Sequence, residues 1–206
     1  MNSISPVITL TTDFGTSDLY VGVMKGVILS INPRAQIIDM TLAIPPQDVY
    51  AAAFLIVSAY RYFPTGTIHV VVVDPGVGSS RRAIACQTET ATFVCPDNGV
   101  LTHILHDENP IHAVTVENPA YALPQISNTF HGRDIFAPVA AHLSRGVPIT
   151  DLGASITALV RLPIPTPQVT DTAIIGHVIW IDGFGNLITN ISHQLLESVG
   201  VSNGFV

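Results

Sequence analysis

The fold is decided by residues 67–82, which read TIHVVVVDPGVGSSRR. Thr67–Val73 is a continuous apolar run, and a strand of this kind is typical of a parallel sheet whose two faces are both covered by helices. The run ends abruptly at Asp74 and passes into a loop of proline and glycine. Ligands of open α/β sheets bind beyond the carboxyl ends of such strands, so the sequence places a candidate site at Asp74.

In the segments before this strand, predicted apolar strands alternate with predicted helices. Asp18 is a natural N-cap for the first helix, and Asn32-Pro33 ends it. This alternation predicts an α/β domain with a mainly parallel sheet flanked by helices. We expect strands at Val7–Thr11 and Gln36–Met40, and helices at Asp18–Ile31 and Asp48–Phe63.

The segments after the strand complete the same domain. Asp134 is expected to cap the last helix, behind the loop that contains His131. Cys86 and Cys95 fall on the two arms of a predicted hairpin, and we expect buried free thiols there rather than a disulfide. The expected elements are a hairpin of Arg82–Gln87 and Ala91–Cys95, a helix at Val100–Leu105, a strand at Ile111–Val116 and a helix at Asp134–Leu143.

The proline-rich stretch 147–171 is the best candidate for a boundary between domains. It divides an N-terminal α/β domain, residues 1–146, from the start of a smaller β-rich domain, residues 172–206. Strands are expected at Ala173–Ile181 and Leu187–Ile191, around the turn Asp182–Asn186. Another strand is expected to begin at Gly204-Phe205-Val206, so the second domain is expected to be incomplete.

The composition excludes some classes of function. The net charge is −7 and there is a single lysine, Lys25, which argues against nucleic-acid binding. The mean hydropathy is +0.46, yet the apolar runs are far too short to span a membrane. Buried strands and subunit interfaces account for the apolar content. Few cysteines and the lack of a signal peptide favour a reduced, cytoplasmic setting.

Aspartates stand where three predicted strands meet loops, at Asp13, Asp74 and Asp182. A short carboxylate there can hold a ribose diol or an ammonium group, but aspartate also caps helices and makes turns. The loop after Asp74 ends in two arginines, Arg81 and Arg82, whose guanidinium groups can reach back to the start of the loop. Arginine can orient an anion or pin a carboxylate, and a simple Asp–Arg brace of a tight turn is the structural alternative.

The third cluster is Phe130-His131-Gly132-Arg133-Asp134. A histidine next to a glycine at a helix entrance is well placed for proton transfer, although a lone histidine is more often structural. The other seven histidines show no metal-ligand spacing, so no metal site is expected. They are His69, His103, His106, His112, His142, His177 and His193.

Together these segments resemble the S-adenosylmethionine hydroxide adenosyltransferase family, relatives of fluorinase and chlorinase enzymes. Four motifs match in the family's order: Thr12-Asp13-Phe14-Gly15 with Asp18, Asp74-Pro75-Gly76-Val77-Gly78 with Arg81, Phe130–Asp134, and Asp182-Gly183-Phe184-Gly185-Asn186. The resemblance implies a β-barrel-like C-terminal domain and a homotrimer. It also implies that the substrate lies between one subunit's N-terminal domain and its neighbour's C-terminal domain.

The resemblance further implies a role for each matching residue. Asp74, Arg81 and His131 correspond to a water-activating trio, and the seven-residue step from Asp74 selects Arg81 over Arg82. Asp13 is expected to hold the ribose hydroxyls. The remaining expected substrate-binding residues are Asp18 and Asp182 at the methionine ammonium, Phe184 and Asn186 near the adenosyl portion, and Phe14 and Phe130 within the matching motifs.

The expected reaction is hydrolysis of S-adenosyl-L-methionine to adenosine and L-methionine, without a cofactor. The halogenases resemble this chain but carry tyrosine in place of Asp74 and His131, and an ionised carboxylate would repel a halide. A halide-dependent adenosyltransferase and a non-catalytic binder of S-adenosylmethionine or adenosine remain as alternatives. The base is left open, because a carboxylate paired with arginine is a poor base and His131 is the other candidate.

Overall fold

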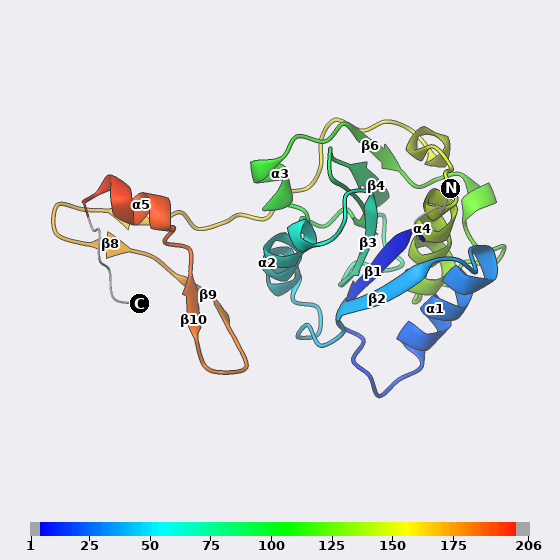
Figure 1. Cartoon of the computed structure of the whole chain (residues 1–206), viewed down its shortest axis with the longest axis horizontal. Helices are drawn as coiled ribbons and strands as arrows, with labels where there is room; N and C mark the ends of the chain where they lie inside the picture. Colours follow the sequence, from blue (N-terminus) through cyan, green and yellow to red (C-terminus); the bar gives the residue numbers. More distant parts are fainter. Residues whose placement is uncertain (1–4, 201–206) are drawn as a thin grey trace. The chain divides into compact units, whose positions relative to one another are not determined.

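The computed structural model describes residues 5–200 and divides the chain into two compact units (Figure 1). One unit ends at Leu162 and the other begins at Pro163, inside the proline-rich stretch. The strand expected to begin at Gly204 lies outside the described residues. Within residues 5–200, none of the helices has the length and apolar character needed to cross a membrane.

The first unit is built on a six-stranded sheet with the order β2-β1-β3-β5-β4-β6. β1, β2, β3 and β5 pair in parallel, and β4 runs antiparallel to both of its neighbours. The mainly parallel sheet predicted from the sequence is thus confirmed. The strands are β1 (Val7–Thr12), β2 (Gln36–Thr41), β3 (Thr67–Val72), β4 (Ala83–Gln87), β5 (Ala91–Pro96) and β6 (His112–Thr115).

Helices cover both faces of this sheet, which is why β3 is buried along its whole length. α1 and α4 lie together on one face, and α2 lies on the other (Figure 1). Successive side chains of a strand point to opposite faces, so Val70 of β3 packs in the core beneath α1 and α4. The helices are α1 (Tyr20–Ile31), α2 (Val49–Ala59), α3 (Ile104–Asp107) and α4 (Ala137–Ser144), with 3₁₀ turns at Tyr60–Tyr62, Pro119–Tyr121 and Ile149–Leu152.

Two helix starts differ from those predicted. α1 begins at Tyr20 with Leu19 as its N-cap, so Asp18 is not the cap; a turn over residues 15–17 delays the helix. The helix predicted at Val100–Leu105 is replaced by turns followed by the short α3. Asp48, in contrast, caps α2 by accepting a hydrogen bond of 2.9 Å from the Ala51 amide.

The prediction that Asp134 caps a helix is wrong. Asp134 lies fully buried inside a π-helical turn, Gly132–Phe136, that leads into α4. Its carboxylate accepts 2.8 Å hydrogen bonds from both the amide and the hydroxyl of Ser127, and it pairs with Arg133. Burial opposes its charge, but the hydrogen bonds from Arg133 and Ser127 outweigh burial and lower the pKa of Asp134. Asp134 therefore ties down the loop that carries His131.

The second unit contains two small antiparallel sheets, and no closed barrel forms among residues 163–200. The strand expected at Ala173–Ile181 is interrupted at Gly176, where a Cβ would lie 2.5 Å from Cγ1 of Ile191. A short helix follows that the sequence did not predict. The elements are β7 (Gln168–Val169), β8 (Ile174–Ile175), β9 (Val178–Ile181), β10 (Leu187–Thr189) and α5 (His193–Ser198).

The two cysteines are buried free thiols, as expected. In the pairing of β4 with β5, Cys86 stands opposite Phe93 and Cys95 stands opposite Ile84, so the thiols do not face each other directly. Burial raises the pKa of Cys86 to about 12. Both thiols are therefore protonated and poorly reactive at neutral pH.

His69 is a buried polar group in the sheet face beneath α2. Its ring lies among the rings of Tyr60, Phe63 and Phe93, and its Nδ1 is 2.8 Å from the Thr9 hydroxyl oxygen. Its Nε2 has no hydrogen-bond partner among residues 5–200. Burial lowers the pKa of His69 to about 4, so the imidazole is neutral in the folded protein at pH 7.

This burial predicts a loss of stability in acid. In the unfolded chain His69 takes up a proton near pH 6.5, whereas the folded chain resists protonation until about pH 4. Stability therefore falls as the pH drops through this window. His69→Gln is expected to reduce the loss between pH 7 and pH 4.5 by about 2 kcal/mol, measured by urea unfolding. An identical pH dependence in both proteins would contradict this assignment.

Candidate active site

The candidate site lies where the carboxyl ends of β1 and β3 meet at the edge of the sheet. The chain leaves β1 through α1 toward β2 on one side, and then returns through α2 to β3 on the other side. Adjacent strands whose connections diverge in this way leave a crevice that commonly holds a ligand. Asp13 follows β1 and Asp74 follows β3, so the order of the strands brings two carboxylates to one crevice.

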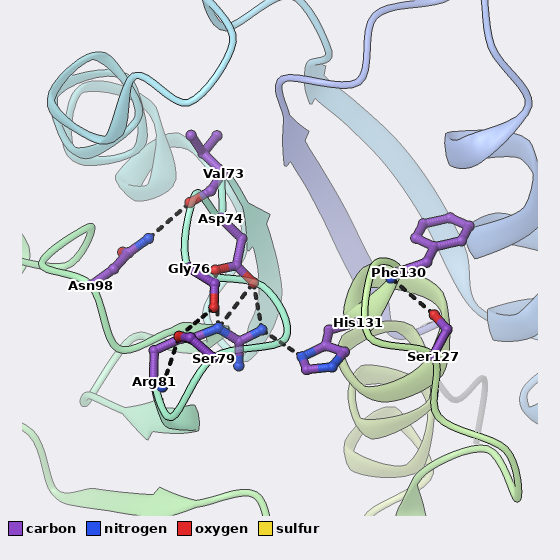
Figure 2. A network of polar contacts seen from close by, with 9 residues as sticks. All are labelled: Val73, Asp74, Gly76, Ser79, Arg81, Asn98, Ser127, Phe130 and His131. Atoms are coloured by element: carbon purple, nitrogen blue, oxygen red, sulfur yellow. Dashed lines mark hydrogen bonds and ion pairs between the residues drawn. The ribbon is translucent and has the colours of Figure 1, made fainter.

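The loop after β3 folds back so that Arg81 contacts Asp74. Tight turns join the Val77 amide to the Asp74 carbonyl and the Ser79 amide to the Gly76 carbonyl. Arg81 Nε lies 2.9 and 3.0 Å from the two carboxylate oxygens of Asp74, and Nη2 lies 2.5 Å from Oδ2 (Figure 2). The side chains of Asp74 and Arg81 are only 5% and 10% exposed, so this pair is largely shielded from water.

His131 extends this pair into a chain of three groups. Arg81 Nη2 donates to Nδ1 of His131 over 2.7 Å, although the two residues are 50 positions apart (Figure 2). Because guanidinium nitrogens only donate, Nδ1 accepts and the proton of the neutral ring is assigned to Nε2. Burial, together with the positive charge of Arg81, lowers the pKa of His131, which favours this neutral form at pH 7.

Close packing fixes the loop that carries Asp74 and Arg81 against the loop that carries His131. Gly78 has φ of 76°, and a Cβ there would lie 2.4 Å from the carbonyl oxygen of Asn128 in the loop that precedes His131. The Phe136 ring lies under Arg81, with the guanidinium carbon 5.3 Å from the ring centroid. Asn98 Nδ2 donates to the Val73 carbonyl at the end of β3 (Figure 2). Packing against several elements therefore fixes the positions of Asp74, Arg81 and His131.

A cavity of about 300 Å³ opens at the trio, and we call it the front pocket. Phe14, Tyr20 and Phe130 form an aromatic cluster on its wall, with ring centroids 5.0 to 5.9 Å apart. Asp74 and His131 face this pocket, and of the predicted substrate-binding residues it gathers four. The lining residues are Asp13, Phe14, Asp18, Tyr20, Pro46, Gln47, Val72, Asp74, Val77, Thr129, Phe130, His131 and Gly132.

Some lining residues had not been singled out from the sequence, notably Tyr20 and Gln47. Gln47 has φ of 65°, which is uncommon for a residue other than glycine, and its amide donates to Asp13 Oδ2 over 2.8 Å. This bond orients the Asp13 carboxylate and leaves Oδ1 available to a ligand. The pair Pro45-Pro46 just before Gln47 was the available signal, because it marks a constrained loop.

The second unit carries the other three predicted substrate-binding residues, which are Asp182, Phe184 and Asn186. Asp182 closes its own turn by accepting from the amides of Phe184 and Asn186, each over 2.9 Å. Hydrogen bonds from the Asn186 side chain and backbone lower the pKa of Asp182. The Phe184 side chain is 96% exposed. Their contribution to a substrate site remains a prediction.

Fold and geometry together define the class of the protein. It is an α/β protein with a pocket where the strand connections of its sheet diverge. A carboxylate, a guanidinium and an imidazole form one hydrogen-bonded chain there, and the carboxylate and the imidazole line the pocket. Among residues 5–200, no three histidine, cysteine or acidic side chains are grouped so that they could hold a metal ion.

Comparison with known proteins identifies the family. The family model described as the SAM hydroxide adenosyltransferase N-terminal domain matches residues 8–153. The chain belongs to this family, as the four sequence motifs indicated.

The relatives include proteins named as hydrolases and proteins named as fluorinases. A protein of Salinispora arenicola named (R)-S-adenosyl-L-methionine hydrolase is 41% identical, over 95% of this chain and 76% of its own length. A fluorinase of Actinoplanes sp. is 30% identical, over 96% of this chain and 75% of its own. The crystal structure of an uncharacterized conserved protein from Thermotoga maritima superimposes with a TM-score of 0.90 at 42% identity, covering 96% of this chain and 75% of that one.

Proposed function

We propose that this protein is an enzyme that hydrolyses S-adenosyl-L-methionine to adenosine and L-methionine. The observation that carries the proposal is the chain Asp74–Arg81–His131, whose carboxylate and imidazole face the front pocket. Relatives named as hydrolases of this compound, at 38–41% identity, support it. Asp13, Asp18 and Asp74 give the pocket an acidic character that suits a cationic substrate.

In the proposed reaction a water oxygen attacks C5′ of the substrate in line with the bond from C5′ to sulfur. The C–O bond forms as the C–S bond breaks, the electron pair of the broken bond goes to sulfur, and the water loses one proton. Attack requires the oxygen to be held about 3–3.5 Å from the carbon. The positive charge on sulfur is neutralised as the C–O bond forms and the C–S bond breaks. Shielding from water strengthens the attraction between the attacking oxygen and the positive sulfonium, because it lowers the local dielectric constant.

The hydrogen-bond pattern supports a different task for each of the three groups. The Nδ1 lone pair of His131 is occupied by Arg81, so the ring offers only its Nε2–H and can hold the water oxygen as a donor. The Asp74 carboxylate keeps lone pairs free beyond those used by Arg81, and it is the group that can accept the water proton. We therefore assign Asp74 as the base, and Arg81 and His131 as the groups that orient the carboxylate and the water.

The substrate is proposed to lie across the front pocket, with Asp13 at the ribose hydroxyls and Asp18 at the methionine ammonium. Phe14 and Phe130 belong to the aromatic wall, which suits a sulfonium because aromatic faces attract cations. As the family resemblance implies, we propose a homotrimer of the cytoplasm in which a neighbouring subunit supplies Asp182, Phe184 and Asn186. The proposed chemistry requires no metal or cofactor.

The products distinguish this proposal from its alternatives. When the full chain is incubated with S-adenosyl-L-methionine, we expect adenosine and methionine in equal amounts, at a rate unaffected by added chloride or fluoride. A 5′-halo-5′-deoxyadenosine product would instead identify a halide-dependent adenosyltransferase. Calorimetric binding of the compound without any product would identify a non-catalytic binder. Chromatography of the nucleosides resolves all three outcomes.

A further inference from the structure

The proposed reaction raises a problem of access, and the inference below rests on that proposed function. Each turnover consumes one water and releases one proton, since a cationic substrate and a water yield two neutral organic products. The substrate itself fills the front pocket while this happens. Water and protons therefore need a second path to the trio.

A second cavity of about 290 Å³ lies at the trio, and we call it the rear pocket. His131 lines both pockets, Asp74 lines the front pocket, and Arg81 lines the rear pocket. The trio thus forms a partition between the two cavities. The Arg81 side chain is 10% exposed and lines the rear pocket, so solvent in that pocket can reach it.

The lining of the rear pocket suits water. Ser80, Arg82, Thr115 and Glu117 contribute hydroxyl, guanidinium and carboxylate groups. Ser80 and Glu117 are exposed residues, so the pocket reaches the molecular surface. Its volume is enough for several waters, each of which takes about 30 Å³ in the liquid. A connected set of polar groups and waters of this kind can pass protons as well as water molecules.

We propose that the rear pocket supplies water to the trio and carries the released proton to solvent while substrate occupies the front pocket. His131 is the residue common to both cavities, so exchange takes place beside its ring. The proton accepted by Asp74 passes to a water beside His131, which lines both pockets, and leaves through waters in the rear pocket to reach solvent near Glu117. No further reactant is needed, because the proton is the only species to be removed on this side.

The test fills the rear pocket reversibly. Ser80→Cys places a reactive thiol at its mouth, while the native Cys86 and Cys95 are buried and poorly reactive. The variant is labelled with methyl methanethiosulfonate or benzyl methanethiosulfonate, and the adenosine-forming rate is measured before labelling, after labelling, and after reduction with dithiothreitol. Ser58→Cys, on an exposed turn of α2, carries the same labels as the matched control.

We expect the benzyl label on Ser80→Cys to lower kcat by about tenfold or more while KM stays nearly constant, because proton removal slows and substrate binding does not. The methyl label should have a smaller effect, and reduction should restore the rate. Labelled Ser58→Cys should match its unlabelled form. An unchanged kcat with the benzyl label in place, verified by mass spectrometry, overturns the rear route.

Failure of this proposal is distinguishable from failure of the proposed function. If the wild-type chain forms no adenosine from S-adenosyl-L-methionine, the hydrolase assignment itself is wrong. If wild type and unlabelled Ser80→Cys both form adenosine and the benzyl label does not slow them, hydrolysis stands and the rear route is wrong. A loss that reduction does not reverse counts against the rear route too, since blockage must be relieved when the label leaves.

Discussion

The Asp74→Asn variant is expected to lose about 10²–10⁴-fold in kcat, the range that general base catalysis contributes, while KM changes little. Asparagine has nearly the same shape but cannot accept the water proton, and it leaves Arg81 without its anionic partner. Steady-state rates of adenosine release measure the loss. Calorimetric titration with S-adenosyl-L-methionine should show that the variant still binds, because Asp13, Asp18 and the aromatic wall remain.

A second Asp–Arg pair in the same region provides the control. Arg82 donates through Nε to Asp97 over 2.9 Å, and Asp97 is nearly fully buried, like Asp74, but lies outside both pockets. Asp97→Asn should lower stability, because it also weakens the bond from the Val160 amide, yet leave kcat close to that of wild type. Equal activity losses in the two variants would show that Asp74 acts only as a brace of its turn.

Gly78→Ala is expected to cause the second large effect, on both stability and rate. The residue adopts a left-handed backbone conformation, which costs about 1–2 kcal/mol with a side chain present. The new methyl group would also meet the Asn128 carbonyl at 2.4 Å, so the loop of Asp74 and Arg81 must move away from the loop of His131. Shifts of about 1 Å in catalytic groups can cost about 100-fold in rate, and we expect a loss of that order.

Gly66→Ala separates the two contributions. Gly66 has φ of 86° in the turn before β3, and a Cβ there meets nothing within 4 Å among the described residues. This variant should show the backbone cost alone, with kcat unchanged. Urea unfolding and adenosine release are measured for both variants. If Gly78→Ala matches Gly66→Ala in stability and rate, the contact between the two loops does not position the trio.

Local signals in the sequence predicted the fold, whereas the trio was expected from the family resemblance. An apolar strand that ends in a carboxylate predicts a buried parallel strand with a site at its end, and β3 and Asp74 have that arrangement. Within the family resemblance, the seven-residue step from Asp74 selected Arg81 over Arg82. In the structure Arg81 contacts Asp74, while Arg82 pairs with Asp97.

Other features depend on contacts between distant segments and could not be predicted from the sequence. The left-handed Gln47 orients Asp13 from a loop 34 residues further along the chain. Asp18 had a helix-capping signal, but the turn over residues 15–17 moves the helix start and leaves Asp18 facing the front pocket. Asp134 resembled a cap as well, and its bonds to Ser127 make it a tether for the His131 loop instead. Local propensity describes such residues poorly because tertiary partners decide their roles.

The most direct test of the account follows the oxygen atom. The full chain is incubated with S-adenosyl-L-methionine in water enriched in ¹⁸O, and the adenosine product is analysed by mass spectrometry with fragmentation of the ribose. If water beside Asp74 and His131 attacks C5′, the heavy isotope appears in the 5′-hydroxyl of adenosine, in proportion to its enrichment in the solvent. Adenosine without the isotope, or a nucleoside with a halogen at C5′, would contradict the account.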